Sequence, residues 1–366
     1  MTRPRAERVD GVKSAAQATP QLAWVDPEAL ATLFETALDS TCAVDLDVSV
    51  ARLPVRVRAA GDAVLSRLSR AISHLEQAEP VVPALTIHVW DSVSTGAGAP
   101  ELPAIPVTDA APKARYAYDD GRVLAAYQPS GGMLSVLDRQ SGQAWFWIRD
   151  ATRIPFLDQA EPLRLILHWW LGDRSVQLLH GGGVGTTAGG VLVTGRNGSG
   201  KSTATLAGLG RSRLRYAGDD YVAVSLDPEP MLFSVYGSGK LERGHATRLP
   251  HLFDDGAPTP SEDEKTVVYV EERFGGSVIP EFPLRAVLLP RITDRARARL
   301  VRATGGEALA ALAPTTLLQL HPPQPNALAN MGRLVREVPV YALELGSDIA
   351  SIPEAILGYL DDGLPA

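Results

Sequence analysis

The segment from Gly195 to Ser202, GRNGSGKS, has the residue spacing of a phosphate-binding loop. The apolar run VLVT precedes it and STATLAGL follows it, so we expect a strand, a tight loop and a helix in that order. Glycines let consecutive backbone N–H groups approach phosphate oxygens, and the start of the following helix adds partial positive charge. Lys201 would reach the β- and γ-phosphates, and the Ser202 hydroxyl would ligate Mg²⁺. The expected nucleotide contacts are Gly195, Arg196, Asn197, Gly198, Ser199, Gly200, Lys201, Ser202 and Thr203.

Two consecutive acids, Asp219 and Asp220, follow the loop after a gap that fits one helix and one strand. We therefore expect them at the start of the next strand, close to the phosphates. Two acids at this place suit two roles, with Asp219 binding the metal ion and Asp220 accepting the proton of an acceptor hydroxyl. A solvated Gly-Asp-Asp turn is the alternative interpretation.

Four further charged or titratable residues are candidates for the same site. His180, in LLHGGGV, is expected on a strand antiparallel to the one that feeds the loop, where it would position Asp220 or contact the reacting phosphate. Lys240 would supply positive charge to the transition state, and a solvated loop lysine is the alternative. Arg285 and Arg291 bracket the run AVLLP, and either is a candidate to contact the γ-phosphate.

Together these motifs resemble the catalytic domain of the HPr serine kinase/phosphorylase family. That domain has a His-Gly pair, a Gly-rich turn, an apolar strand, G-x-x-G-x-G-K-S, a helix and Ala-Asp-Asp. The matching residues here are His180-Gly181, Gly189-Gly190, VLVTG, GRNGSGKS and Ala217-Gly218-Asp219-Asp220, with the acid pair offset by about one residue. The resemblance covers roughly residues 175–245. It implies a P-loop kinase that uses ATP and Mg²⁺. With the candidates named above, we expect His180, Lys201, Asp220, Lys240 and Arg291 to be catalytic residues and Ser202 and Asp219 to lie at the metal.

One stretch departs from that family. Where the family has Glu-Ile-Arg-Gly-Leu-Gly, this chain runs from Ser234 to Lys240 without a carboxylate. The sequence is more similar to the HPr-kinase-like proteins of bacterial lasso-peptide gene clusters, which share LH-x-x-x-V, GDDY and YG-x-x-K. Those proteins phosphorylate a C-terminal serine of a precursor peptide, so this resemblance implies a peptide or protein acceptor.

Two other functions fit the same motifs. One is a small-molecule kinase of the shikimate or gluconate type, although in those enzymes the phosphate loop usually opens the chain. The other is a nucleotide-dependent switch protein with slow hydrolysis, which would not need a base beside the metal-binding acid.

The elements that must position these residues indicate an α/β fold with α+β character. The pattern predicts a strand or hairpin over 42–59, an amphipathic helix over 61–77 and a strand over 85–91. A four-stranded meander follows, with turns at Asp120-Gly121, Gly131-Gly132 and Ser141-Gly142. We divide the chain into a disordered N-terminus (1–20), an N-terminal α+β module (21–155) and a P-loop kinase catalytic domain (156–366).

Bulk composition excludes several classes of protein. The formal net charge of −7 argues against sequence-independent nucleic-acid binding. No apolar run of eighteen residues is present, and the single Cys42 cannot form an internal disulfide. We therefore expect a cytoplasmic protein that does not bind membranes. A homo-oligomer is compatible with the sequence.

Overall fold

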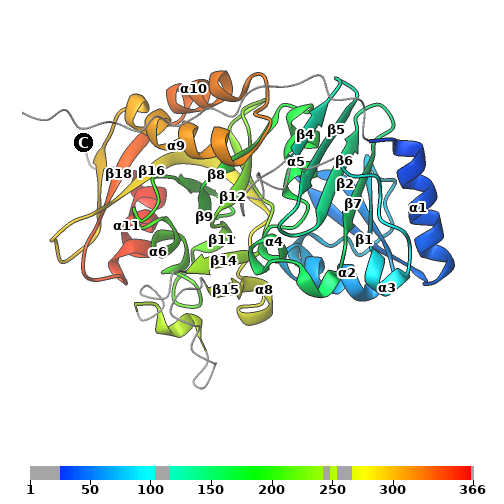
Figure 1. Ribbon diagram of the computed structural model, residues 1–366. Helices are drawn as coiled ribbons and strands as arrows, with labels where there is room; N and C mark the ends of the chain where they lie inside the picture. The colour runs from blue at the N-terminus through cyan, green and yellow to red at the C-terminus, as the bar shows by residue number, and fades with distance from the viewer. Residues whose placement is uncertain (1–24, 104–115, 242–247, 254–265, 364–366) are drawn as a thin grey trace, which may run out of the picture.

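The computed structural model describes residues 25–103, 116–241, 248–253 and 266–363, so the N-terminus predicted to be disordered lies outside the described residues. The chain forms two main β-sheets that lie side by side, each covered by helices (Figure 1). This confirms the predicted mixed α/β class. None of the helices in the described ranges is long and apolar enough to cross a membrane.

The N-terminal sheet, as far as the chain is described, has the strand order β1-β2-β3-β7-β6-β5-β4. Strand β3 pairs in parallel with β2 on one side and with β7 on the other. The remaining neighbouring pairs of this sheet are antiparallel. The predicted hairpin, the strand over 85–91 and the meander are all confirmed. The strands are β1 (Ala43–Val50), β2 (Leu53–Ala60), β3 (Leu85–Asp91), β4 (Tyr116–Asp119), β5 (Val123–Gln128), β6 (Met133–Asp138) and β7 (Gln143–Ile148).

Helices cover both faces of this sheet because its side chains alternate between two apolar layers. Helix α1 (Pro27–Asp39) packs Phe34 against the face that carries Trp90 and Trp147. Helices α2 (Asp62–Leu68) and α5 (Arg164–Gly172) pack on the opposite face. The short helices α3 (Ser92–Thr95) and α4 (Phe156–Ala160) lie at its margins (Figure 1).

The helix predicted over 61–77 is shorter than expected. After α2 the chain forms two 3₁₀ turns, Ser69–Ala71 and Ser73–Leu75. The Ala71 carbonyl accepts a 2.7 Å hydrogen bond from the backbone N–H of Gly237, far along the chain. A tertiary hydrogen bond therefore takes the place of a helical one.

The second sheet has the order β11-β9-β10-β16-β13-β12-β8 within the described residues, and β18 and β17 extend it from β16. The long strand β16 joins its two halves, pairing with β13 near its start and with β10 and β18 farther along. The strands are β8 (Val176–His180), β9 (Gly182–Thr186), β10 (Gly189–Val193), β11 (Arg215–Gly218), β12 (Tyr221–Ser225), β13 (Met231–Ser234), β16 (Glu281–Ile292), β17 (Arg299–Arg302) and β18 (Val340–Leu345).

Side chains of β10 and β16 alternate between two apolar layers of this sheet. Val191 and Leu288 lie in the layer covered by α6 (Lys201–Leu206) and α11 (Ser351–Asp362). Leu192 and Val287 lie in the layer covered by α9 (Gly305–Gln319) and α10 (Ala327–Glu337). A separate two-stranded sheet of β14 (Ser238–Leu241) and β15 (Thr266–Tyr269), with α8 (Val270–Arg273) after it, lies below β11 in Figure 1.

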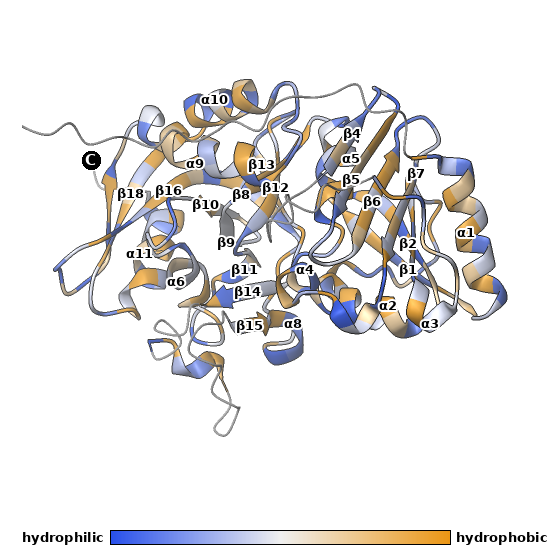
Figure 2. Ribbon diagram, in the orientation of Figure 1, coloured by the Kyte–Doolittle hydropathy of each residue, from blue (hydrophilic) through white to orange (hydrophobic). Residues whose placement is uncertain are grey.

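One apolar core joins the two sheets. It contains Ile87 and Phe146 of the N-terminal sheet together with Leu178, Ala223 and Met231 of the second. Figure 2 shows apolar strands on both sides of the region around α4 and α5. The N-terminal module is therefore packed against the part of the chain that carries the phosphate-binding motif.

We expect Leu178→Ala to destabilise the protein by about 2–5 kcal/mol, because it leaves a cavity in this shared core. Leu178 is fully buried. Leu318→Ala, at a side chain that is 81% exposed, is the matched control and should change stability by less than about 0.5 kcal/mol. Urea denaturation measures both; equal losses in the two variants would contradict the shared core.

Candidate active site

The predicted phosphate-binding loop connects β10 to α6, as its motif requires. Gly198 and Gly200 have φ angles of +75° and +101°, which side chains rarely adopt. A Cβ on Gly195 would lie 2.6 Å from the Ser199 hydroxyl, and one on Gly200 would lie 2.4 Å from Leu345. Within the described part of the chain the buried Ser199 Oγ has no hydrogen-bond partner. These features fit a cradle of backbone N–H groups and one hydroxyl for an anion such as a phosphate.

Lys201 lies within this loop rather than in solvent. Its Nζ donates hydrogen bonds to the carbonyl oxygens of Gly195 (3.0 Å) and Arg196 (3.2 Å), and the residue is only 7% exposed. To bind a phosphate, Lys201 would exchange these carbonyl oxygens for phosphate oxygens.

The chain changes direction at two places beside the loop, and the two backbones meet there. β8 passes into β9 at Gly181, β11 passes into β12 at Asp219-Asp220, and the Gly181 N–H donates to the Asp220 carbonyl at 3.0 Å. A Cβ on Gly182 would lie 2.5 Å from Thr205 of α6. The glycines of LLHGGGV therefore allow the acid pair to approach α6. The acids lie at the junction of two strands, which corrects the expectation that they start one strand.

The Asp219 carboxylate is buried and points at the phosphate-loop helix. Its Oδ1 accepts from Thr205 Oγ1 (2.9 Å) and its Oδ2 accepts from the backbone N–H of Lys240 (3.0 Å). A hydrogen bond from Ser202 also favours its ionised form. Burial nevertheless raises the pKa of Asp219 to about 6, and the charge of Asp220 adds to the shift. A cation bound nearby would therefore stabilise the ionised form of Asp219.

The Asp220 carboxylate forms an ion pair with Lys240. The two side chains lie 3.1 Å apart, from Lys240 Nζ to Asp220 Oδ2, and Asp220 keeps 23% of its side chain exposed. Burial opposes ionisation of Asp220, but Lys240, joined in acid by protonated His180, outweighs it and lowers the pKa of Asp220 to about 2. Asp220 is thus an ionised, partly accessible carboxylate at neutral pH. Lys240 is 6% exposed and lies on β14, so it is not the solvated loop lysine of the alternative interpretation.

Sequence reasoning missed two charged residues of this cluster, Glu161 and Arg164. Glu161 forms ion pairs with both Lys240 and Arg164, and Arg164 lies over the Tyr221 ring at 5.1 Å. Burial raises the pKa of Glu161 to about 7, although Arg164 and Lys240 oppose the shift. The only local signal was an acid and an arginine three residues apart in EPLR, a pattern that surface helices share.

Backbone strain accompanies these two residues. Leu163, between them, has φ +58° and ψ +18°, a left-handed conformation that is uncommon for a residue with a branched side chain. Such conformations persist where the surroundings enforce them, and they cluster at functional sites. Here Leu163 ends the turn after α4 and leads into α5. Glu161 before it and Arg164 after it belong to the same cluster of ion pairs.

His180 lies at the end of β8, beside Asp220 and Tyr221. β8 pairs with β12, whereas the strand antiparallel to β10 is β9, so the predicted strand pairing of His180 is wrong by one strand. Its Nε2 lies 3.9 Å from Asp220 Oδ1, which is longer than a hydrogen bond. Burial lowers the pKa of His180 to about 4, opposed by Asp220 and reinforced by the charges of Lys201 and Lys240. His180 is therefore a neutral ring at pH 7.

Neither candidate arginine is brought to the cluster. Arg291 lies on the α9 side of β16 and pairs with Glu307 of α9 at 2.6 Å, whereas Pro290 faces the glycines of the loop. Arg285 contacts Gly189 at the other end of β10, about 15 Å along the strand from the loop. The arginine that does lie with the acids is Arg164, which was not among the candidates predicted from the sequence.

Comparison with known proteins adds little to this geometry. No protein-family model matches the chain, and no curated protein does. Among solved structures, the Hpr(Ser) kinase/phosphatase from Coxiella burnetii matches 50% of this chain and 95% of its own, at 13% sequence identity and a TM-score of 0.28. That TM-score is too low to establish a shared fold, so the assignment of the site rests on its residues.

We expect the His180 ring to stay neutral down to about pH 5, because burial disfavours its charged form. NMR spectra of histidine-labelled protein, with the His180 signal assigned by its loss in His180→Gln, measure the pKa directly. The urea-unfolded protein, in which histidine should titrate near 6.5, is the control. A native pKa of 6.5 or above would mean that His180 is charged against Asp220.

Proposed function

We propose that this protein is an ATP-dependent kinase that transfers the γ-phosphoryl group to the hydroxyl of a serine in a peptide or protein. The observation that carries the proposal is the different surroundings of two adjacent carboxylates. Asp219 is bonded to Thr205 of the phosphate-loop helix, and Asp220 is ion-paired to Lys240 and partly accessible. A nucleotide switch would need only the first of these.

The residues that would hold the nucleotide and metal follow from the fit described above. The loop N–H groups, Ser199 and Lys201 would bind the phosphates, and Ser202 and Asp219 would bind Mg²⁺. The described residues contain no group of three or more His, Cys, Asp or Glu that could hold a metal ion. This agrees with an ion whose remaining ligands come from phosphate and water, as Mg²⁺ prefers. When bound, Mg·ATP supplies the phosphoryl group and neutralises its charge.

Asp220 would act on the acceptor. As the hydroxyl oxygen forms its bond to the γ-phosphorus and the bond to the β-phosphate oxygen breaks, Asp220 takes the hydroxyl proton and ADP leaves. Lys240 keeps Asp220 ionised before the reaction and places positive charge beside the transferring group. His180, as a neutral ring, would orient Asp220 rather than supply charge.

The nature of the acceptor rests on the pattern shared with lasso-peptide-cluster kinases, in particular GDDY and YG-x-x-K. It favours the C-terminal serine of a precursor peptide. The N-terminal module, packed against the second sheet through a common core, gives such an acceptor more surface than a small metabolite needs. Phosphorylation of shikimate-like or sugar substrates without any transfer to a peptide would overturn this assignment of the acceptor.

Transfer from γ-labelled ATP to a precursor peptide encoded beside the gene tests the function, with mass spectrometry to locate the phosphate. Lys201→Ala should abolish transfer while leaving the fold intact, because it removes a phosphate contact and no apolar core side chain. Circular dichroism checks the fold of the variant. Transfer that persists at a comparable rate in Lys201→Ala would refute the assigned phosphate site; ADP release without any phosphorylated acceptor would favour a switch protein.

Asp220→Asn should lower the transfer rate by about 10²–10⁴-fold while ATP affinity stays nearly the same, because only the proton acceptor is lost. Single-turnover transfer and equilibrium ATP binding measure the two effects separately. If rate and affinity fall by the same factor, Asp220 binds the metal, and the roles of Asp219 and Asp220 are exchanged.

A further inference from the structure

Glu161 is a buried carboxylate that the reaction described above does not use. It lies in the turn between α4 and α5, and its side chain is 2% exposed. Both of its ion-pair partners are cations that face the site, Lys240 and Arg164. An acid buried this deeply cannot touch an acceptor, so any role in transfer must act through these partners.

Lys240 depends on Glu161 for its position. Its Nζ lies between Glu161 Oε1 and Asp220 Oδ2, with its ammonium group ion-paired to both. Burial alone would lower the pKa of Lys240, but the two carboxylates outweigh it and the net shift is upward. A lysine side chain has four rotatable bonds, and a single acid partner would leave it free to choose other rotamers. Two carboxylate partners restrict these rotamers more than one partner does.

The turn that carries Glu161 is itself tied to the segment that carries Lys240. Ser238 Oγ donates to the Ala160 carbonyl, and Tyr236 Oη donates to the Pro162 carbonyl at 3.0 Å. These bonds flank Glu161 on both sides. The turn is therefore tied to the segment from Tyr236 to Lys240 on both sides of the ion pair.

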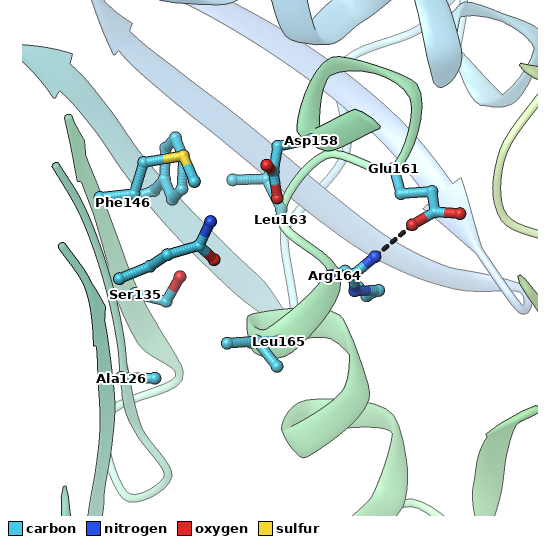
Figure 3. A pocket seen from close by; sticks show the side chains of 10 residues that line it. Ala126, Ser135, Phe146, Asp158, Glu161, Leu163, Arg164 and Leu165 are labelled. Carbon is cyan, nitrogen blue, oxygen red and sulfur yellow. Dashed lines mark hydrogen bonds and ion pairs between the residues drawn. The ribbon is translucent and has the colours of Figure 1, made fainter. Parts of the chain in front are cut away.

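The turn also lies close to the N-terminal sheet. Figure 3 shows a cavity between that sheet, represented by Ala126, Ser135 and Phe146, and the turn with Glu161 and Arg164. The cavity has a volume of only about 30 Å³, so there is little room for Glu161 to withdraw from Lys240. His74 of the same module bonds Ser234 at 2.8 Å, just before the Lys240 segment.

We propose that Glu161 is a positioning residue that, held by Arg164 and the N-terminal module, fixes Lys240 against Asp220. The proposal deepens the kinase function given above and rests on it for its effect on rate. It also assigns the N-terminal module a part in the active site. Lys240 is placed by Glu161, and the turn that carries Glu161 lies against the N-terminal sheet.

A spectroscopic test does not depend on activity. In protein labelled with ¹⁵N at lysine side chains, the buried Lys240 ammonium should give a slowly exchanging signal, identified by its absence in Lys240→Met. Glu161→Gln should remove or broaden that signal. Glu281→Gln, which breaks a partly exposed ion pair with Arg52 between the same two modules, should leave it unchanged. A persistent, unshifted signal in Glu161→Gln would overturn the proposal whatever the protein's function.

Kinetics then test the consequence for transfer. Glu161→Gln should lower kcat by about 10²-fold, as misplacing a catalytic group does, with ATP binding changed by less than about twofold. In a Lys240→Met background the same substitution should change kcat by less than about twofold, because Glu161 acts through Lys240. A full additional loss in that background would show that Glu161 acts independently of Lys240 and would refute the proposal.

If Glu161→Gln does not fold, Glu161→Asp keeps the charge with a shorter reach and should give a smaller loss of kcat. An unchanged kcat in Glu161→Asp together with an unchanged Lys240 signal would equally refute the positioning role. A wild-type protein that shows the Lys240 signal and its loss in Glu161→Gln but transfers no phosphate would instead refute the kinase function alone.

Discussion

The site depends on pairing charges that have been taken out of water. Asp219, Asp220 and Glu161 share a largely buried space with two cations, Lys240 and Arg164. Isolated buried charges cost several kcal/mol each, so such a cluster persists only when every member has a partner in good geometry. The acids outnumber the cations, and burial accordingly raises the pKa values of Asp219 and Glu161. The strand corners, the turn before α5 and the two-stranded β14–β15 sheet all hold members of this cluster in place.

The position of the cluster follows from how closely the backbones approach. Asp219 reaches Thr205 only because Gly182, between them in space, has no side chain. Asp219 and Asp220 are adjacent in the chain yet have different partners, since one faces α6 and the other faces Lys240. A strand that turns a corner can thus present two neighbouring carboxylates to two different surroundings.

Features that depend on a few neighbouring residues were predictable from the sequence. The strand, loop and helix around GRNGSGKS, the meander, and the turns at Gly121, Gly132 and Gly142 follow from local glycine placement and alternation, and all are present. The predicted helix over 61–77 ended early because the Ala71 carbonyl bonds Gly237, a residue in another element. Glu161 escaped notice for the same reason: nothing near it in the sequence reveals that Lys240 will lie beside it. Whether Lys240 was solvated could not be decided without knowing that it would join a strand.

That strand has a consequence for how the protein matures. In the described chain, β14 has β15 as its sheet partner, and Glu161, Asp220 and Lys240 come from three distant parts of the sequence. Contacts between distant segments form late in folding, because the intervening loops must close first. A chain emerging from the ribosome already contains the complete phosphate loop when Ser202 appears, but Lys240 cannot be held in its strand until Tyr269 has been made. The residues of the predicted phosphate loop are therefore made well before the strand that holds Lys240 can form, so a partly synthesised chain carries the loop without the complete set of ion pairs.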